Sequence, residues 1–137
     1  MKTKSESSAA AHRAADRADK FAAAFLALKR AFLPHEKHLH ISADTRGRYY
    51  LETRSPSYQG RPLFFGAVTS GRAYVSFHLM PLYWDASLRK RVSAKLKKHM
   101  QGKSCFNFTA APEPALLREL IGLTTAGFAL YRHKNLL

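Results

Sequence analysis

The sequence predicts an α+β fold, an antiparallel sheet of about five strands packed against N-terminal, middle and C-terminal helices. Apolar residues recur at helical spacing near both ends of the chain, and they alternate with polar residues between positions 38 and 108. The 137 residues, of which 46% are hydrophobic, are enough for one core. We therefore expect a single domain over residues 9–137 after a flexible N-terminus over residues 1–8.

The alanine-rich segment at residues 9–33 is predicted to form the first helix. Phe21, Phe25, Leu28 and Phe32 recur at spacings of three and four, which places them on one apolar stripe. Pro34 has no amide hydrogen for the helical ladder, so the helix is expected to end just before it.

Five short runs with alternating polarity follow and are read as strands. Gly47 and the Ser70-Gly71 pair interrupt them where hairpins need tight turns, and glycine adopts a positive φ there at no steric cost. The first four strands should form an antiparallel meander. The predicted strands cover residues 38–43, 48–54, 62–69, 73–80 and 104–109.

A basic helix is predicted over residues 87–100, between the fourth and fifth strands. Its apolar residues, from Leu88 to Met100, recur every fourth position. Ser87 is a suitable N-cap, and Gly102 follows the basic last turn as a C-terminal glycine would.

The last helix should begin between Pro112 and Pro114, because proline is tolerated in a first turn. It should run through a leucine-rich stripe to Leu123, and Gly127 is expected to weaken or end it.

Charge is the strongest global signal. The chain has 23 Lys and Arg residues against 9 Asp and Glu, a formal net charge of +14. Such a field favours an anionic partner, either a nucleic acid or an acidic protein. No apolar segment approaches the roughly 20 residues that a membrane span needs, and the lone Cys105 is typical of a reducing compartment. We therefore expect a cytoplasmic location.

The basic helix is the first candidate site, because a phosphate backbone could lie along its cationic side. The alternative is an ordinary solvated face. The candidate anion-binding residues are Lys90, Arg91, Lys95, Lys97, Lys98 and Lys103.

The fourth strand carries the second candidate site. Its polar and aromatic side chains alternate with Val75, Phe77 and Leu79, which should face the core. In the alternative interpretation, the N-terminal helix covers this polar face. The candidate sheet-face residues are Tyr74, Ser76 and His78, joined by Tyr49 and Asn107 if these emerge on the same side.

Three further motifs carry weaker signals. His38 and His40 would share one face of a strand and form the weak candidate metal site, against the alternative of a half-exposed strand edge. Cys105 is read as a small buried hydrophobe rather than a nucleophile. The Gly102-Lys103-Ser104 sequence leads from helix into strand, the reverse of a phosphate-binding loop.

Two runs carry a family resemblance. Phe65-Gly66-Ala67-Val68, a turn, and residues 74–81 resemble the strand-turn-strand core of the YdhG-like, frataxin-like family of domains of unknown function. Residues 102–108 resemble the glycine-lysine-serine strand entry that this family has after its basic helix. With the leucine-rich helix, the resemblance covers residues 48–131 and implies the same order of elements.

The resemblance also implies an iron-handling role. However, a frataxin-type iron surface needs clustered carboxylates, and the nine acidic residues here are scattered. The favoured function is therefore a non-enzymatic binding protein for an anionic partner such as nucleic acid. The alternative is a frataxin-like iron or small-molecule carrier. No cofactor is predicted, iron enters only through the resemblance, and no triad, carboxylate pair or complete cofactor loop indicates an enzyme.

Overall fold

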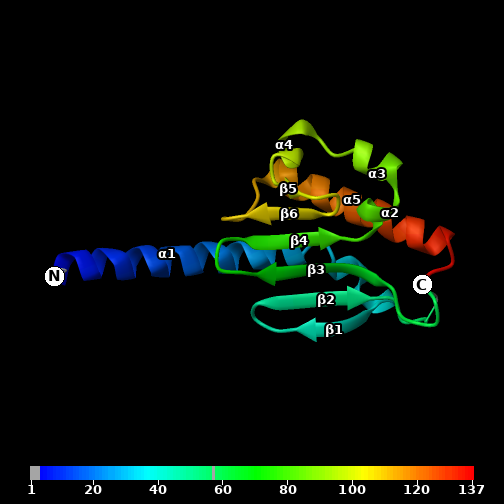
Figure 1. Cartoon of the computed structure of the whole chain (residues 1–137), viewed down its shortest axis with the longest axis horizontal. Helices are drawn as coiled ribbons and strands as arrows, with labels where there is room; N and C mark the ends of the chain where they lie inside the picture. The colour runs from blue at the N-terminus through cyan, green and yellow to red at the C-terminus, as the bar shows by residue number, and fades with distance from the viewer. Residues whose placement is uncertain (1–3, 57) are drawn as a thin grey trace.

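Six antiparallel strands form one sheet in the order β1-β2-β3-β4-β6-β5 in the computed structural model, which describes residues 4–56 and 58–137 (Figure 1). The predicted α+β fold is confirmed. The sheet has one strand more than predicted, because the short β5 pairs with β6 at the sheet edge. The strands are β1 His40–Asp44, β2 Arg48–Glu52, β3 Phe64–Ser70, β4 Val75–Leu79, β5 Met100–Gln101 and β6 Cys105–Phe108.

The first four strands pair in succession, so the predicted antiparallel meander is confirmed. Its hairpin turns fall at Gly47 and Gly71 as expected, but the glycines with positive φ are Gly60 and Gly102. The latter lies in the turn between β5 and β6 and does not terminate a helix.

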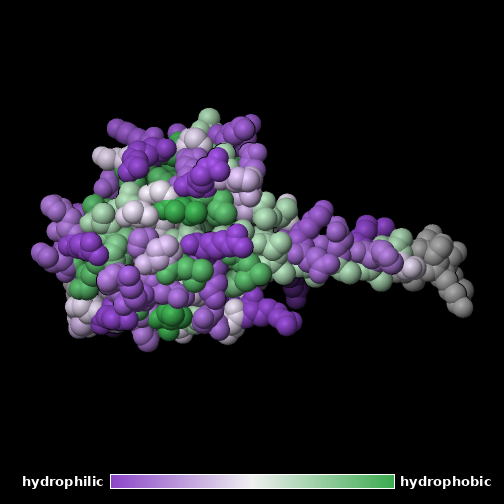
Figure 2. Space-filling model, turned by 180° about the vertical axis from the view of Figure 1, so that it is seen from behind, coloured by the Kyte–Doolittle hydropathy of each residue, from purple (hydrophilic) through white to green (hydrophobic). Residues whose placement is uncertain are grey.

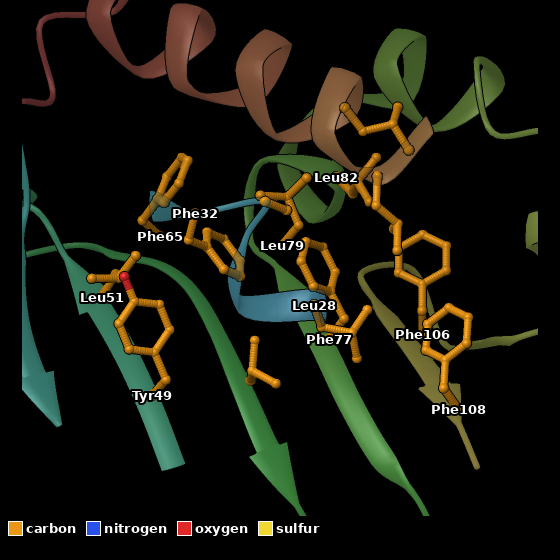
Figure 3. Close-up of a cluster of buried hydrophobic side chains, with 14 of the residues drawn as sticks. Leu28, Phe32, Tyr49, Leu51, Phe65, Phe77, Leu79, Leu82, Phe106 and Phe108 are labelled. Atoms are coloured by element: carbon orange, nitrogen blue, oxygen red, sulfur yellow. The ribbon is translucent and has the colours of Figure 1, made fainter. Parts of the chain in front are cut away.

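The helices pack against one face of the sheet. They are α1 Lys4–Lys29, the 3-10 helix η1 Leu33–His38, and α5 Pro114–His133, with three short helices between β4 and β5. Phe32 stacks on Phe77 of β4 with ring centroids 4.8 Å apart, and Phe65 of β3 meets Tyr131 of α5 at 5.3 Å. Figure 3 shows the apolar side chains filling the space between the strands and the helices.

The predicted stripe is buried, since Phe21, Phe25 and Leu28 of α1 and Phe32, which follows the helix, are all under 10% exposed. The helix ends at Lys29 rather than at residue 33, because the amides of Ala31 and Phe32 turn back to carbonyls only three residues earlier. At the other end it already includes residues 4–8, while residues 1–3 of the predicted flexible start lie outside the described residues. Its N-terminal part extends away from the body (Figure 2).

The predicted basic helix over residues 87–100 is wrong as a single element. The chain instead forms α2 Pro81–Trp84, α3 Ala86–Lys90 and α4 Ala94–Lys97. Asp85, not Ser87, caps α3, because its carboxylate accepts hydrogen bonds from the amides of Ser87 (2.8 Å) and Leu88 (3.1 Å).

A tertiary contact causes the break between α3 and α4. The carboxylate of Glu119 in α5 accepts hydrogen bonds from the amide of Ser93 (2.7 Å) and from its hydroxyl (2.6 Å). Ser93 in turn caps α4 by accepting from the amide of Leu96. Leu88, Val92 and Leu96 stay buried despite the break and Met100 is partly buried, so the helical spacing identified the core-facing side chains but not the interruption.

Helix α5 continues to His133, so the prediction that Gly127 weakens or ends it is wrong. Gly127 lies where α5 crosses the start of α2. A Cβ at this position would be 2.8 Å from the ring of Pro81. Glycine is therefore required here for a close approach of two helices. No helix in the described part of the chain has the length and apolar character to cross a membrane.

Replacing Gly127 by Ala is expected to destabilise the protein by about 1–3 kcal/mol, because the added methyl group overpacks the contact with Pro81. Gly122→Ala is the matched control in the same helix, where an added Cβ meets nothing within 4 Å. That change should stabilise by about 0.5–1 kcal/mol. Urea denaturation measures both, and equal effects would contradict the close approach.

His35 is buried where η1 packs against α5. Its ring stacks on Phe128 at 4.6 Å, and burial lowers its pKa below the ordinary value of 6.5, with the charges of His38 and Arg132 acting in the same direction. The unfolded chain therefore takes up this proton at a higher pH than the folded chain. The contribution of His35 to the free energy of unfolding is therefore fully present above about pH 6.5. It decreases as the pH falls below that value.

We expect His35→Phe to lose less stability between pH 7 and pH 5 than the parent chain, because the ring contact is kept and the titration is removed. The exposed His12→Phe is the control and should lose as much as the parent. Denaturation midpoints measured at several pH values test this, and the same acid loss in all three proteins would contradict it.

Candidate functional site

One face of the sheet carries no helix among residues 4–56 and 58–137. Val75, Phe77 and Leu79 point into the helical layer and are fully buried, whereas Ser76 and His78 between them are half-buried. In Figure 1 the strands pass in front of α1 and α5. The alternative in which the N-terminal helix covers the polar face is therefore wrong, because the phenylalanines of α1 pack on the opposite side.

Three rings lie side by side across three strands of this open face. Tyr50 of β2 stacks on Phe64 of β3 with centroids 4.5 Å apart, and Phe64 meets the edge of His78 of β4 at 4.8 Å. All three side chains are half-buried and reach solvent. We call Tyr50, Phe64 and His78 the aromatic band.

A β-bulge places Phe64 in this band. Leu51 pairs with Gly66, but the next residue of β2, Glu52, pairs with Phe64, so Phe65 is an extra residue in β3. Phe65 and Gly66 both belong to the buried side, and Phe64 returns to the open face.

Burial favours the neutral form of the His78 ring. Its Nε2 lies 2.8 Å from the hydroxyl of Ser104, and burial lowers its pKa below the ordinary value. The neighbouring Cys105 pairs with His78 across the strands, and burial raises the pKa of its thiol, which disfavours the nucleophilic thiolate. Burial thus favours the neutral forms of both side chains.

A row of polar groups runs beside the aromatic band. The hydroxyl of Ser76 donates to Oδ1 of Asn107 at 2.8 Å, and Nδ2 of Asn107 donates to Gln101 at 2.8 Å. The hydroxyl of Tyr74 also reaches Gln101, at 3.4 Å. The prediction that Tyr74, Ser76, His78 and Asn107 share one side of the sheet agrees with this geometry, and the hydrogen bonds fix their positions.

Tyr49 does not belong to this face, so its prediction as a site residue is wrong. It pairs with Val68, which pairs with Phe77, and this register places its ring in the core (Figure 3). Its hydroxyl donates to Glu36 at 2.6 Å, and burial together with this hydrogen bond raises its pKa. The open position belongs to Tyr50.

Cations border the open face. The guanidinium of Arg48 lies 5.2 Å from the centre of the Tyr50 ring. Lys103 lies elsewhere, with its ammonium 5.7 Å from the ring of Tyr83 in α2. Arg46 and Arg72 are exposed in the two hairpin turns at the Arg48 end of the sheet. Positive charge and aromatic rings therefore occur together.

The basic helix residues form a separate surface. They lie on α3 and α4 and their flanks, beyond the β5 edge of the sheet, and do not share one helical face (Figure 1). The exposed side chains are Lys90, Arg91, Lys95, Lys97 and Lys98, of which Lys95 lies 3.7 Å from Glu113.

His38 and His40 do not lie on one strand face, so that prediction is wrong. His38 ends η1, with its ring 5.6 Å from Phe128, whereas His40 begins β1 and lies 4.0 Å from Glu52. The described residues contain no group of three or more His, Cys, Asp or Glu side chains that could hold a metal ion.

The fold and the open face define an α+β protein whose sheet is backed by helices on one side and meets solvent on the other. Compared with known proteins, the chain matches no family model, no curated protein and no solved structure. The YdhG-like assignment stays a prediction from the sequence.

The two neighbouring tyrosines provide a test of the face assignment. Tyr49→Phe removes a buried hydrogen bond to a carboxylate and should destabilise by about 1–3 kcal/mol. Tyr50→Phe should change stability by less than about 0.5 kcal/mol, as expected of a surface substitution. Thermal or urea denaturation measures both, and the reverse order would contradict the register.

Proposed function

We propose that this protein binds single-stranded nucleic acid on the open face of its sheet, without catalysing a reaction. The aromatic band supports this most directly, because it offers stacked, solvent-reaching rings on a sheet face that no described element covers. Unpaired bases bind such platforms by stacking on aromatic side chains, and every base has a π-face.

The charge supports a polyanionic ligand. The net charge is +14, and Arg48 lies directly against a ring of the band. A strand whose bases stack on Tyr50 and Phe64 would bring its phosphates within reach of Arg48 and of the arginines in the hairpin turns. An acidic protein would satisfy the charge but would leave the ring surface without a matching partner.

The dimensions of the sheet favour a single strand over a duplex. Six strands spaced about 4.8 Å apart make a surface about 24 Å wide, twice the roughly 12 Å of a DNA major groove. The bases of a duplex are also stacked on one another and are not free to stack on protein rings. We therefore expect a clear preference for single-stranded RNA or DNA.

Tyr50→Ala and Phe64→Ala should each weaken binding of a labelled single strand by about 5- to 150-fold, the equivalent of about 1–3 kcal/mol per stacked base. Arg48→Glu should weaken binding and lower its salt dependence, because it removes a phosphate contact. Fluorescence anisotropy at several salt concentrations, with duplex and single-stranded RNA and DNA, measures these effects.

The controls are changes of the same type on the helical side. Leu26→Ala alters an exposed apolar residue of α1, and Arg118→Glu reverses an exposed charge of α5. Both should bind nearly as the parent does. Duplex binding as tight as single-strand binding would contradict the proposal, as would an affinity lost in Lys97→Glu and Lys98→Glu but kept in the band variants.

A further inference from the structure

A second aromatic group lies outside the aromatic band, beside the helical layer. Tyr58, Tyr83 and Trp84 are 39%, 50% and 46% exposed, an unusual amount for large rings. The Trp84 ring centre lies 5.8 Å from that of Tyr58 and 5.4 Å from that of Tyr83. They belong to the β2–β3 loop and to α2 and are not part of the core.

Two of these rings line a cavity of about 240 Å³. Tyr58 and Trp84 form part of its wall, and Leu63, Leu130 and Leu136 contribute apolar surface. Of the residues described around the cavity, Lys134 alone is charged, and its side chain is exposed. The pocket therefore combines aromatic and aliphatic walls with one cation.

A fixed hydrogen-bonded residue connects the cavity to the open face. Tyr131 also lines the cavity, is 1% exposed, and donates its hydroxyl to the carbonyl of Phe64 at 2.7 Å. This hydrogen bond fixes Tyr131 of the pocket wall to the backbone of Phe64, a residue of the aromatic band.

The cavity has the size of one ring system. It exceeds the roughly 150 Å³ in which a benzene molecule fits, and it is smaller than the roughly 300 Å³ at which drug-sized sites begin. A flat apolar ring would contact Trp84 and Tyr58, and an anionic group beside that ring would meet Lys134.

We propose that this pocket holds a single unstacked nucleobase of the bound strand, with the adjoining phosphate facing Lys134. The inference rests on the proposed function for the class of ligand and adds a specific subsite to it. Because the walls are mainly apolar, the pocket should accept all four bases, with preferences set by ring size rather than by hydrogen bonds.

Mononucleotides test the pocket independently of strand binding. Trp84 is the only tryptophan of the chain, so tryptophan fluorescence reports on this wall alone. Titration with the four nucleoside monophosphates should change the emission saturably, uncharged nucleosides should bind more weakly, and ribose 5-phosphate should have no effect.

Variants separate the ring contact from the charge. Lys134→Glu should weaken monophosphate binding at least about fivefold and leave nucleoside binding unchanged, because only the phosphate meets this side chain. Lys98→Glu, a charge reversal on α4, is the matched control and should have no effect. Tyr58→Ala should weaken nucleosides and monophosphates alike.

The outcomes distinguish the two proposals. Tyr50→Ala should weaken strand binding and leave the mononucleotide response intact. Strand binding without any emission change for the four monophosphates would overturn the pocket and leave the open-face proposal standing. A response to N-acetylphenylalaninamide but not to monophosphates would also overturn it. A mononucleotide response without strand binding would overturn the open-face proposal and, with it, the role of the pocket as a subsite for a strand.

Discussion

The ring of Phe32 lies on the sheet where Gly66 leaves room for it, and the position of the helical layer depends on this contact. Phe32 stacks on Phe77 and also meets Phe65 and Tyr49. A Cβ on residue 66 would collide with the Phe32 ring. Because this contact fixes the end of α1 on one face of β3 and β4, the other face is left for solvent and for a ligand.

The sequence predicted the elements that depend on local pattern and missed those that depend on distant contacts. The apolar stripe of α1 and the four-strand meander follow from spacing alone. The break at Ser93 does not, since it requires Glu119 of α5, 26 residues later. Gly127 was likewise misread because Pro81, which it must accommodate, lies far away in the sequence.

The candidate site shows the same division. Ser76, His78 and Asn107 could be placed on one side because β4 and β6 alternate regularly. Tyr49 and Tyr50 are adjacent and chemically equal, so only the buried Leu51, two residues after Tyr49, could have assigned Tyr49 to the core. Phe64 was missed because a bulge breaks the alternation. Arg48 was missed because its role in the site depends on its contact with the Tyr50 ring, which the sequence alone does not show.

Several of the nine carboxylates form hydrogen bonds or ion pairs within the protein, and this affects the electrostatic field at its surface. Glu36 accepts from the Tyr49 hydroxyl, Glu119 from Ser93, and Asp85 caps α3. Asp44 pairs with Lys29. These four carboxylates are committed to contacts within the protein, whereas Glu52 alternates with Arg48 and Tyr50 on the open side of β2 and offsets part of the positive charge there.

The extension of α1 beyond the sheet has a consequence for how that helix forms. Its 26 residues span about 39 Å, and only the last third, from Phe21 onward, packs its apolar side chains against the strands. A free helix of this kind would be marginal, because its first turn fixes several residues for one hydrogen bond. Here the packed part of α1 supplies that first turn. The alanine-rich remainder therefore extends from an existing helical end, one hydrogen bond per residue, and its opening would leave the core contacts intact.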